Sequence, residues 1–594
     1  MPILPAIGRK TPKVRLVIAA IYALLVLGGI TMVYPLLVML SGSVKGQADT
    51  EQMDALPEFL LSPRLRFARF MEDRYGTLTN LSSAYGREVM RFRDLPEAPG
   101  GEQVALLRGF LRSQTAAPDH FYWVADAGNI QSMQLRNFRA LREALRSECG
   151  SVREFTRRYG LPITTWNDFP GVLDNPATKE FNYERTALYD RYLRFKRALP
   201  AADRAWVNVD GLYVLAQSKM AGTKSGAWPR QSLLAERMPP GAAAKPWAEF
   251  VKHGLNCLFV RLDDDGLAGF RADLWRRFGG DVGKMNALLE TSYSSFADIR
   301  CTLEELRDSA LFTAYTQFIT DRCPPERLLV DAMNTRYRAY AAAHQPDAAR
   351  TAPPIAAYDH AVFEATHGAW LTETLTRNYR IVVGYVTVYG RAVLNTVALI
   401  GLSVLAALLV NPAAAYALSR FRLKNTYGIL MFFLATMAFP GAVTMIPNFL
   451  LLKELHLLNS YWALVLPGLA NGFNIFILKG FFDSIPQEMY ESAMLDGAGE
   501  WVMFWRFTMA LSTPVLALTA LGAFTSAYSA FMFALIICPD ERMWTIMVWL
   551  YQLQQTAHQS VVFAALVLAA LPTLLVFVLA QRVIMQGIVV PIEK

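Results

Sequence analysis

The chain has 594 residues, of which 53% are apolar, and its formal net charge is +8. A chain of this length and apolar content is too long for one domain and too apolar for a purely soluble protein, so we expect a membrane portion and a soluble portion. The basic residues are scattered and form no long block, which argues against a nucleic-acid partner.

The first fifteen residues carry four basic side chains and no acid, and an uncharged apolar run follows from Leu16 to Leu40. This run matches the ~20 residues that a helix needs to cross a bilayer, and it is longer than the apolar core of a cleaved signal peptide. We therefore predict a retained transmembrane helix within residues 1–45, with the basic N-terminus in the cytoplasm.

No segment from Gly46 to Tyr385 is apolar enough to span a membrane, because charged residues recur throughout it. We predict that residues 46–385 form a soluble extracytoplasmic insert. Apolar residues at three-to-four spacing in Met133–Arg146 and Tyr183–Ala198 predict amphipathic helices, whereas strand-like alternation is sparse.

The insert contains an internal repeat. Its three copies begin at glycines, namely Gly76, Gly150 and Gly280. Eighteen residues after each glycine, and two residues after an aromatic side chain, lies an aspartate: Asp94, Asp168 and Asp298. In the last two copies a second correspondence follows, between Leu188, Tyr192, Phe195, Pro200 and Leu311, Tyr315, Phe318, Pro324. The pattern predicts a helix ended by glycine, a short helix, and a loop whose aspartate caps or turns the next element.

Other features of the insert carry weaker hypotheses. The segment Asn286–Asp298 faintly resembles a helical segment of some glycoside hydrolases, but no pair of catalytic carboxylates stands out and the strand pattern is too sparse for a barrel. The acidic run Leu262–Gly266 lacks the ligand spacing of a calcium loop, so we interpret it as a solvated turn. The chain has five cysteines without metal-ligand spacing, which are either buried free thiols or, for the four in the insert, partners in one or two disulfides: Cys149, Cys257, Cys301, Cys323 and Cys538.

Five further apolar runs follow in close order: Ala392–Leu418, Tyr427–Pro447, Tyr461–Leu478, Leu511–Ile537 and Val561–Ala580. The loop after the first of them holds Arg420, Arg422 and Lys424 without an acid, which places it in the cytoplasm by the positive-inside rule. Residues 386–594 are therefore predicted to form a five-helix membrane core. With the first helix this makes six spans, and both termini are predicted to be cytoplasmic.

An acidic, amphipathic stretch over residues 485–514 separates two of these runs, and the predicted topology places it in the cytoplasm. A short helix, a turn at Gly497 and a second helix would make a compact knob. Met489, Ala493 and Met494 are the apolar residues that could face a groove. From the residues alone, the alternative is an ordinary interfacial linker.

The sequence Glu491-Ser492-Ala493, followed by Asp496-Gly497-Ala498, resembles the EAA loop of the inner-membrane permeases of bacterial ABC importers. The similarity is to the carbohydrate type that imports maltose and glycerol-phosphate; it covers the first span loosely and Val386 to the C-terminus closely. It rests on further motifs in order: Asn395-Thr396, Ala415 to Arg420, Phe439-Pro440, Leu457 to Ser460 and Leu466-Pro467. The resemblance implies that the loop docks on a cytoplasmic ATPase through Glu488, Glu491, Ala493, Asp496, Gly497 and Glu500.

The chain also departs from the family. Ala510 stands where the family commonly has proline, so we expect a softer bend at the end of the loop. Tyr528-Ser529 stands where the family commonly has Trp-Asn, which weakens the transfer of a substrate contact to these two residues. Candidates for a translocation path are Asn411, Asn471, Asn474, Tyr528 and Ser529, and for the asparagines helix-to-helix hydrogen bonding is an equal alternative.

The chain has no Walker-type loop with its Lys-Ser/Thr, so we expect it to bind no cofactor of its own. The resemblance implies an ABC ATPase dimer that holds ATP and Mg, a second permease subunit and an extracytoplasmic solute-binding protein, with lipid around the spans.

We therefore expect an all-α membrane protein of six transmembrane helices with a mainly helical, repeat-containing insert, in the bacterial inner membrane. Its predicted function is that of a non-enzymatic permease subunit that imports a sugar, oligosaccharide or related polar solute by alternating access. One alternative is a membrane-anchored extracytoplasmic protein that binds or hydrolyses carbohydrate, which would need only one span. A secondary transporter is the other, and it would commonly carry charges within its spans. The insert is either a docking or receptor-like module or a rigid helical spacer.

Overall fold

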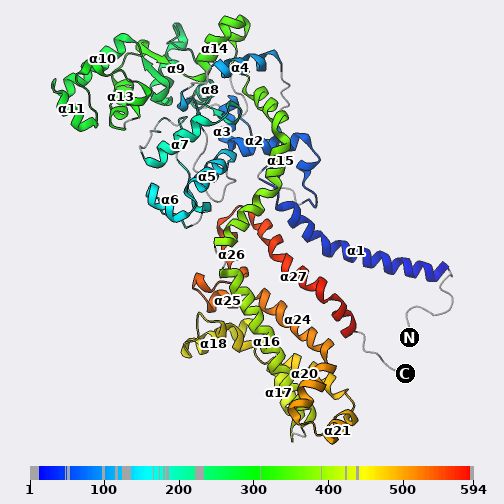
Figure 1. Cartoon of the computed structure of the whole chain (residues 1–594). Helices are drawn as coiled ribbons and strands as arrows, with labels where there is room; N and C mark the ends of the chain where they lie inside the picture. The colour runs from blue at the N-terminus through cyan, green and yellow to red at the C-terminus, as the bar shows by residue number, and fades with distance from the viewer. Residues whose placement is uncertain are drawn as a thin grey trace. The chain divides into compact units, whose positions relative to one another are not determined.

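The structure is a computed structural model that describes residues 12–46, 48–49, 54–95, 101–113, 118–123, 135–164, 166–172, 174–177, 179, 181, 186–220, 233–307, 309–388, 391–421, 424–436 and 440–588. Of the segments used above, residues 1–11, Met133, Tyr183, Arg422, Phe439 and the last six residues of the chain lie outside this part. The chain divides into two compact units, Met1–Arg377 and Asn378–Lys594, each described by itself below. Figure 1 traces the helices that make up nearly all of both units.

The first unit begins with α1 (Pro12–Gly42), an uninterrupted apolar helix. Its most apolar stretch has no residue buried against the rest of the described chain. A helix that is apolar on all sides and exposed on all sides has the character of a membrane span. Helix α1 therefore fits the first predicted span, Leu16–Leu40.

The predicted repeat is confirmed, because three successive segments fold in the same way. Each has a long helix, an eight-residue helix and a three-residue 3-10 helix. In the first copy these are α2 (Pro63–Tyr75), α3 (Leu78–Tyr85) and η2 (Phe92–Asp94). The second copy has α5 (Arg136–Cys149), α6 (Val152–Tyr159) and η4 (Trp166–Asp168). The third has α10 (Asp264–Arg277), α11 (Val282–Leu289) and η9 (Phe296–Asp298).

Local chemistry explains where the helices of each copy end and begin. The repeat glycines have φ values of 73°, 68° and 77°, a left-handed backbone that ends a helix readily at glycine: Gly76, Gly150 and Gly280. The next residue in each copy caps the short helix, since its side chain accepts the backbone N–H three residues on: Thr77, Ser151 and Asp281. The repeat aspartate ends the 3-10 helix in every copy, and in the third it also closes a capping box, in which Asp298 accepts the backbone N–H of Ser295 at 2.8 Å.

The second correspondence is confirmed as well. Helices α7 (Ala187–Ala198) and α13 (Ser309–Asp321) each lead through a 3-10 helix, η5 (Ala201–Asp203) or η10 (Pro325–Arg327), into a short strand. Strand β2 (Ala205–Trp206) pairs antiparallel with β1 (Tyr122–Trp123), and β4 (Leu328–Val330) pairs with β3 (Val260–Leu262). The sequence analysis missed these strands, because two or three residues are too few for alternation to show.

The remaining elements of the first unit complete its helical core. They are η1 (Glu58–Leu60), α4 (Glu102–Ser113), η3 (Asp119–Phe121), α8 (Val209–Met220), η6 (Gly241–Ala243), α9 (Ala244–Glu249), the π-helix η7 (Phe250–Gly254), η8 (Cys257–Phe259), α12 (Leu303–Leu306), α14 (Met333–His344), η11 (Pro346–Arg350) and α15 (Ile355–Val388). One large apolar core unites the repeats, from Ala48 to Trp370. All five cysteines are free, and Cys301 alone among them is partly exposed.

The prediction of a solvated turn at Leu262–Gly266 is wrong. Strand β3 ends at Leu262, and Asp263 is the cap of α10, because its carboxylate accepts the backbone N–H of Gly266 at 2.8 Å. The acidic run is therefore the first turn of a helix, where negative side chains are favourable.

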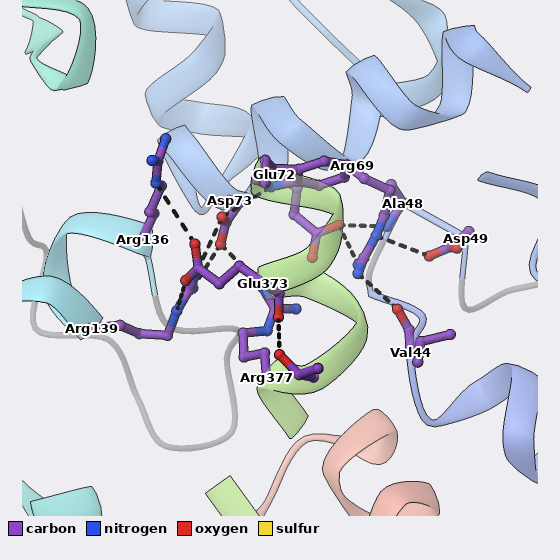
Figure 2. Close-up of polar contacts among 12 residues, drawn as sticks. Val44, Ala48, Asp49, Arg69, Glu72, Asp73, Arg136, Arg139, Glu373 and Arg377 are labelled. Atoms are coloured by element: carbon purple, nitrogen blue, oxygen red, sulfur yellow. Dashed lines mark hydrogen bonds and ion pairs between the residues drawn. The ribbon is translucent and has the colours of Figure 1, made fainter. Parts of the chain in front are cut away.

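A buried ionic cluster joins α2, α5 and α15 within the first unit (Figure 2). Asp73 is 3% exposed and accepts hydrogen bonds from Arg139 at 2.7 and 3.2 Å and from Arg377 at 3.1 Å. Glu373 accepts a second bond from Arg139 at 2.7 Å, and Trp370 donates its indole N–H to Asp73 at 3.2 Å. Buried ions need such mutual pairing, because they have lost their hydration.

A second group of charges, also seen in Figure 2, holds the chain where it leaves α1. Arg69 of α2 is 1% exposed and donates to the carbonyl of Val44 at 3.1 Å and to Glu72 at 3.2 Å. Glu72 in turn accepts the backbone N–H of Ala48 at 3.1 Å. Gly46 lies so close to the Arg69 guanidinium that a Cβ there would come within 1.2 Å of it, so any larger residue would displace this buried side chain.

The second unit is a helix bundle built around α16 (Arg391–Arg420), which contacts α20 (Gly472–Asp483), α24 (Thr513–Ser529) and α26 (Ile546–Thr556) (Figure 1). Helix α27 (Gln559–Ile588) packs against α24 and α26. The other elements are α17 (Thr426–Thr436), α18 (Gly441–Glu454), α19 (Tyr461–Val465), η12 (Leu466–Gly468), α21 (Gln487–Leu495), α22 (Glu500–Val502), the π-helix η13 (Met503–Thr508), α23 (Met509–Leu511), α25 (Met532–Ile537) and η14 (Glu541–Met543).

Among the described residues, three helices are long and apolar enough to cross a membrane: Val14–Gly42, Arg391–Arg420 and Gln559–Gln581. The number rises to as many as five if each of two bent pairs of helices is one span. These pairs are Tyr461–Gly468 with Gly472–Asp483, bent by 52°, and Glu500–Leu511 with Thr513–Ser529, bent by 82°. The predicted span Tyr427–Pro447 is divided between α17 and α18. At the end of the loop, where a softer bend was expected near Ala510, the chain turns by 82° at Ser512, just before Pro514.

Candidate functional site

The predicted acidic loop folds into a knob made of α21, a glycine turn, α22 and η13, which we call the coupling knob (residues 487–508). Helix α21 ends at Leu495, and Gly497, the residue after its C-cap, has a φ of 81°. The backbone N–H of Ala498 reaches back to the carbonyl of Ala493 at 2.9 Å, and that of Gly497 reaches Met494 at 3.0 Å. This pattern is a Schellman motif, which needs a left-handed residue at the turn.

Arg420, the last residue of α16, anchors the coupling knob to the bundle. Its guanidinium lies 3.7 Å from the centre of the Tyr490 ring in α21. It also donates to the carbonyls of Phe482, in the last turn of α20, and of Ile485, just beyond that helix. A planar cation suits both tasks, because it stacks on an aromatic face while its N–H groups satisfy carbonyls left free at a helix end.

Two more hydrogen bonds complete the anchoring. Tyr416 of α16 donates its hydroxyl to Glu500 at 2.7 Å. The hydroxyls of Tyr490 and Thr508 lie 2.7 Å apart, and Thr508 also donates to the carbonyl of Met503 at 3.1 Å inside the π-helix. The π-helix thus gives Thr508 a position from which it holds α21, a use of π-bulges that recurs at functional sites.

The predicted coupling residues do not all lie on one surface. Five are exposed: Glu488, Glu491, Asp496, Gly497 and Glu500. Ala493 is 4% exposed and packs inward beside Tyr490. The idea that Ala493 faces a groove together with Met489 and Met494 is therefore wrong, since the two methionines point outward, with exposures of 41% and 51%.

Apolar side chains project from the tip of the coupling knob. Leu495 is 90% exposed and Trp501 is 73% exposed, on either side of the Gly497 turn. Large apolar side chains that gather at an exposed turn mark a surface that another molecule covers. Sequence analysis missed both residues, although an exposed tryptophan in an acidic loop was a signal that could have been used.

The five candidates for a translocation path occupy different environments. Asn411 is 1% exposed, and its side-chain amide oxygen accepts the backbone N–H of Asn471 at 2.8 Å, at the break between η12 and α20. Asn471 caps α20, since it accepts the backbone N–H of the half-buried Asn474 at 3.0 Å. Tyr528 is buried and donates its hydroxyl to a carbonyl of α27, whereas Ser529 is exposed. Asn411 and Asn471 thus satisfy backbone groups that a broken helix leaves free.

Three anchoring residues, Tyr416, Arg420 and Thr508, were not predicted as site residues. Arg420 was noted as a topological charge and as part of a motif, but its contacts lie 62 to 70 positions further along the chain. No local pattern in the sequence reveals such partners.

The fold and the site define a class of protein. Long apolar helices, some of them interrupted, form a multi-pass membrane bundle. One polar loop of this bundle carries an exposed apolar knob that is firmly tied to a spanning helix. Such a protein is a membrane-embedded subunit that works with a separate partner.

Comparisons with known proteins agree with this class. Residues 400–590 match the family described as binding-protein-dependent transport system inner membrane component. The polygalacturonan/rhamnogalacturonan transport system permease protein YtcP of Bacillus subtilis is 32% identical over 220 residues, which are 34% of this chain and 72% of that protein. The maltodextrin transport system permease protein MalD of Streptococcus pneumoniae is 30% identical and covers 34% of this chain and 74% of its own length. Among solved structures, a chain of a bacterial ABC transporter involved in the import of the acidic polysaccharide alginate is 25% identical. The match covers 33% of this chain and 74% of that one, with a TM-score of 0.30.

The chain therefore belongs to the family of binding-protein-dependent inner-membrane transport components. It is the permease subunit of an ABC importer, a multi-pass protein of the inner membrane. Such permeases are not enzymes themselves, and their ATPase lies in a partner. The family match begins at residue 400, so the insert lies outside it.

Proposed function

We propose that this permease imports a sugar, an oligosaccharide or a related polar solute. The relatives described above are named for polygalacturonan, rhamnogalacturonan and maltodextrin, and a third relative, from Streptomyces coelicolor, is named for diacetylchitobiose. All of these are saccharides, and this common chemistry supports the proposal. Solute would reach the permease through an extracytoplasmic solute-binding protein.

The coupling knob is the proposed contact with the ATPase dimer, which would hold ATP and Mg. Leu495 and Trp501 would supply apolar area, and the exposed acids Glu488, Glu491 and Asp496 would flank it. Gly497 leaves open space around its Cα in the isolated chain, which would let a partner backbone approach closely. The exposed apolar tip of the coupling knob is the observation that carries this proposal.

The anchoring contacts suggest how movement would pass into the membrane. When the ATPase closes, a pull on α21 would act through Tyr490 on Arg420, and a pull on α22 would act through Glu500 on Tyr416. Both recipients lie in the last turns of α16, around which the bundle is built. The bundle would then change between inward- and outward-facing states, paired with a second permease subunit.

Topology and path complete the proposal. Both termini and the coupling knob would lie in the cytoplasm, and residues 46–385 would lie outside it, as the distribution of basic residues in short loops favours. The polar residues near the helix breaks, Asn471, Asn474 and Ser529, would border the solute path. Asn411 and Tyr528 would act there by fixing the helices, as their hydrogen bonds suggest.

The test is uptake by Gly497→Asp in cells that carry the complete importer. Because a left-handed backbone costs a residue with a Cβ about 1–2 kcal/mol, and because the new carboxylate would enter the partner contact, we expect uptake to fall about tenfold or more. Gly499→Asp is the companion variant: Gly499 has a φ of −75° and stands at a helix N-cap, so an aspartate there adds the same charge to the coupling knob without backbone strain and separates the two causes. Normal transport by Gly497→Asp, with the protein at its usual level in the membrane, would rule out the coupling assignment.

A further inference from the structure

The positive charge of the described insert is concentrated in its second repeat. Helices α5, α6 and α7 together carry eleven basic and four acidic side chains, a net charge of +7. In the first copy, α2, α3 and the next helix, α4, carry six basic and three acidic side chains, and in the third copy α10, α11 and α13 carry four of each sign. Four of these eleven basic side chains are paired with acids outside the three helices, namely Arg136, Arg139, Lys196 and Arg197, so the unbalanced positive charge lies on the remaining arginines.

The repeat itself shows that the fold does not require this charge. On α6 the basic residues are Arg153, Arg157 and Arg158. At the same distances from the repeat glycine, the first copy has Thr79, Ser83 and Ala84, and the third has Gly283, Ala287 and Leu288. On α7, Arg191 and Arg194 correspond to Ala314 and Gln317 of α13. In repeat proteins, equivalent positions that differ on the surface of one module point to a role outside folding.

Arg158 of α6 and Arg191 and Arg194 of α7 lie around Glu148, near the end of α5, and Arg153 and Arg157 lie on the same short helix as Arg158. Glu148, near the end of α5, accepts hydrogen bonds from Arg191 of α7 and lies 2.9 Å from Arg158 of α6. Arg157 is 79% exposed and is paired with Glu154 one turn away at 2.7 Å, and Arg153 and Arg194 are also exposed. Glu148 and Glu154 thus leave an excess of three positive charges on this surface, which we call the arginine face (Arg153, Arg157, Arg158, Arg191 and Arg194).

Aromatic rings border the arginine face. The guanidinium of Arg158 lies 5.5 Å from the centre of the Tyr159 ring. Tyr159 and Trp166 are both half-buried, and both pack against Phe155, with ring centres 5.1 and 5.4 Å from it. Because Tyr159 and Trp166 are packed against Phe155 and only half-buried, each exposes part of a flat apolar ring.

We propose that the arginine face binds a saccharide that carries carboxylates, such as an oligouronide. This inference rests on the proposed function, because it takes the solute to be a carbohydrate. Arginine forks match planar carboxylates, and Glu148 between Arg158 and Arg191 already shows this pairing within the chain. The apolar face of a sugar ring would lie against Tyr159 or Trp166, which favours a saccharide over a lipid headgroup or an acidic protein surface.

The test is calorimetric titration of the full-length chain, in discs of uncharged phosphatidylcholine, with trigalacturonate and with neutral maltotriose. The triple variant Arg153→Gln/Arg157→Gln/Arg194→Gln removes three exposed charges and leaves the contacts of Glu148 in place. Its matched control, Arg276→Gln/Arg277→Gln/Arg300→Gln, removes three exposed charges from the third repeat. Thermal unfolding of each variant verifies that the insert is intact.

We expect the parent to bind trigalacturonate, more weakly as salt rises from about 20 to about 500 mM, and to bind maltotriose less well. Exposed charge pairs contribute about 0.2–1 kcal/mol each, so the triple variant should raise the dissociation constant about tenfold, and the control should leave it unchanged. Three results would overturn the inference: the triple variant binds trigalacturonate as tightly as the parent, the parent binds maltotriose equally well, or the arginine face binds phosphatidylglycerol in discs and not trigalacturonate. ATP-driven uptake of both saccharides is measured alongside. Failure of all uptake would count against the proposed function. Uptake without binding at these arginines would count against the arginine face alone.

Discussion

Asp73 shows how single residues hold the insert together. Burial by itself would raise the pKa of its carboxyl, but Arg139 and Arg377 outweigh this effect and lower the pKa to about 2. The two arginines lie 66 and 304 positions further along the chain, so the carboxylate ties together helices that are distant in sequence.

We expect Asp73→Asn to lower the free energy of unfolding of the insert by about 3–5 kcal/mol, because it leaves Arg139 and Arg377 buried without their shared anion. Chemical unfolding followed by tryptophan fluorescence measures this change. Asp321→Asn, at an exposed acid of α13, is the control and should change stability by less than about 0.5 kcal/mol. Because the folded pKa of Asp73 lies below its usual value, its contribution is complete above about pH 4 and is lost as pH falls towards 2, so the two proteins should converge in acid. A constant difference down to pH 2 would contradict this account.

His120 is the opposite case, a buried titratable group without a partner. It is 3% exposed between Phe121 and Phe259, with ring centres 4.7 and 5.1 Å away, and neither ring nitrogen has a hydrogen-bond partner among the described residues. Burial lowers its pKa to about 3, and the nearby Asp119 and Asp331 oppose this shift only weakly. The imidazole is therefore neutral in the folded insert at neutral pH.

We expect His120→Phe to stabilise the insert, because the substitution removes buried nitrogens that have no hydrogen bond. Such unpaired nitrogens destabilise the parent protein by about 1–3 kcal/mol. The sign of the pH effect follows from the lowered pKa. The unfolded chain takes up a proton below about pH 6.5 while the folded one does not, so the parent loses stability as pH falls from about 6.5 towards 3. The advantage of the variant should grow over this window in chemical unfolding curves, and an advantage independent of pH would refute the explanation.

At the scale of elements, the family motifs acquire distinct structural tasks. Asn395, near the start of α16, donates to the carbonyls of Arg542 and Trp544 at 2.8 and 3.0 Å, and accepts the hydroxyl of Tyr461 at 2.7 Å. At the other end of the same helix, Arg420 carries α21 and the end of α20. Helix α16 is thus fastened to loops at both ends, which makes it the natural element to carry a movement through the bundle.

We expect Arg420→Gln to uncouple the ATPase from transport, because it removes both the cation stacked on Tyr490 and the donors to Phe482 and Ile485. Uptake should fall about tenfold, which corresponds to a loss of about 1.4 kcal/mol of coupling free energy, while the complex still assembles and hydrolyses ATP. Purified complex in proteoliposomes allows ATP hydrolysis and uptake to be compared. Lys424→Gln, an exposed cation four residues on, is the matched control, and equal uptake by both variants would argue against transmission through Arg420.

For the whole molecule, the division into two units separates two kinds of task. The insert is a tandem of three modules around one apolar core, and only its second module carries the arginine face. The membrane unit has several small cores, and its helices are interrupted where polar side chains satisfy the backbone. A well-packed core gives the insert a fixed surface, whereas broken helices with separate cores suit a bundle that must change its packing.

Much of this architecture is visible in the sequence, because it depends on neighbouring residues. Apolar runs predicted α1, α16 and α27, and glycines followed by capping residues predicted the repeat with the correct spacing. The coupling knob was also predicted, since a helix, a left-handed glycine and a second helix follow from local chemistry. The strands of two or three residues were not predicted, because their partners lie elsewhere in the chain. The Leu262–Gly266 run was misread although its cap is local, since Asp263 accepts the backbone N–H of Gly266 three residues on.

What the sequence by itself determined is therefore the membrane character of the chain, its repeated insert and the loop that carries the family resemblance. The tertiary structure alone decided that Arg420 stacks on Tyr490, that Ala493 turns inward while Leu495 and Trp501 project, and that Asp73 shares two arginines. The reason is physical: hydropathy, capping and backbone conformation act over a few residues, whereas charge pairs and packing join residues that only folding brings together.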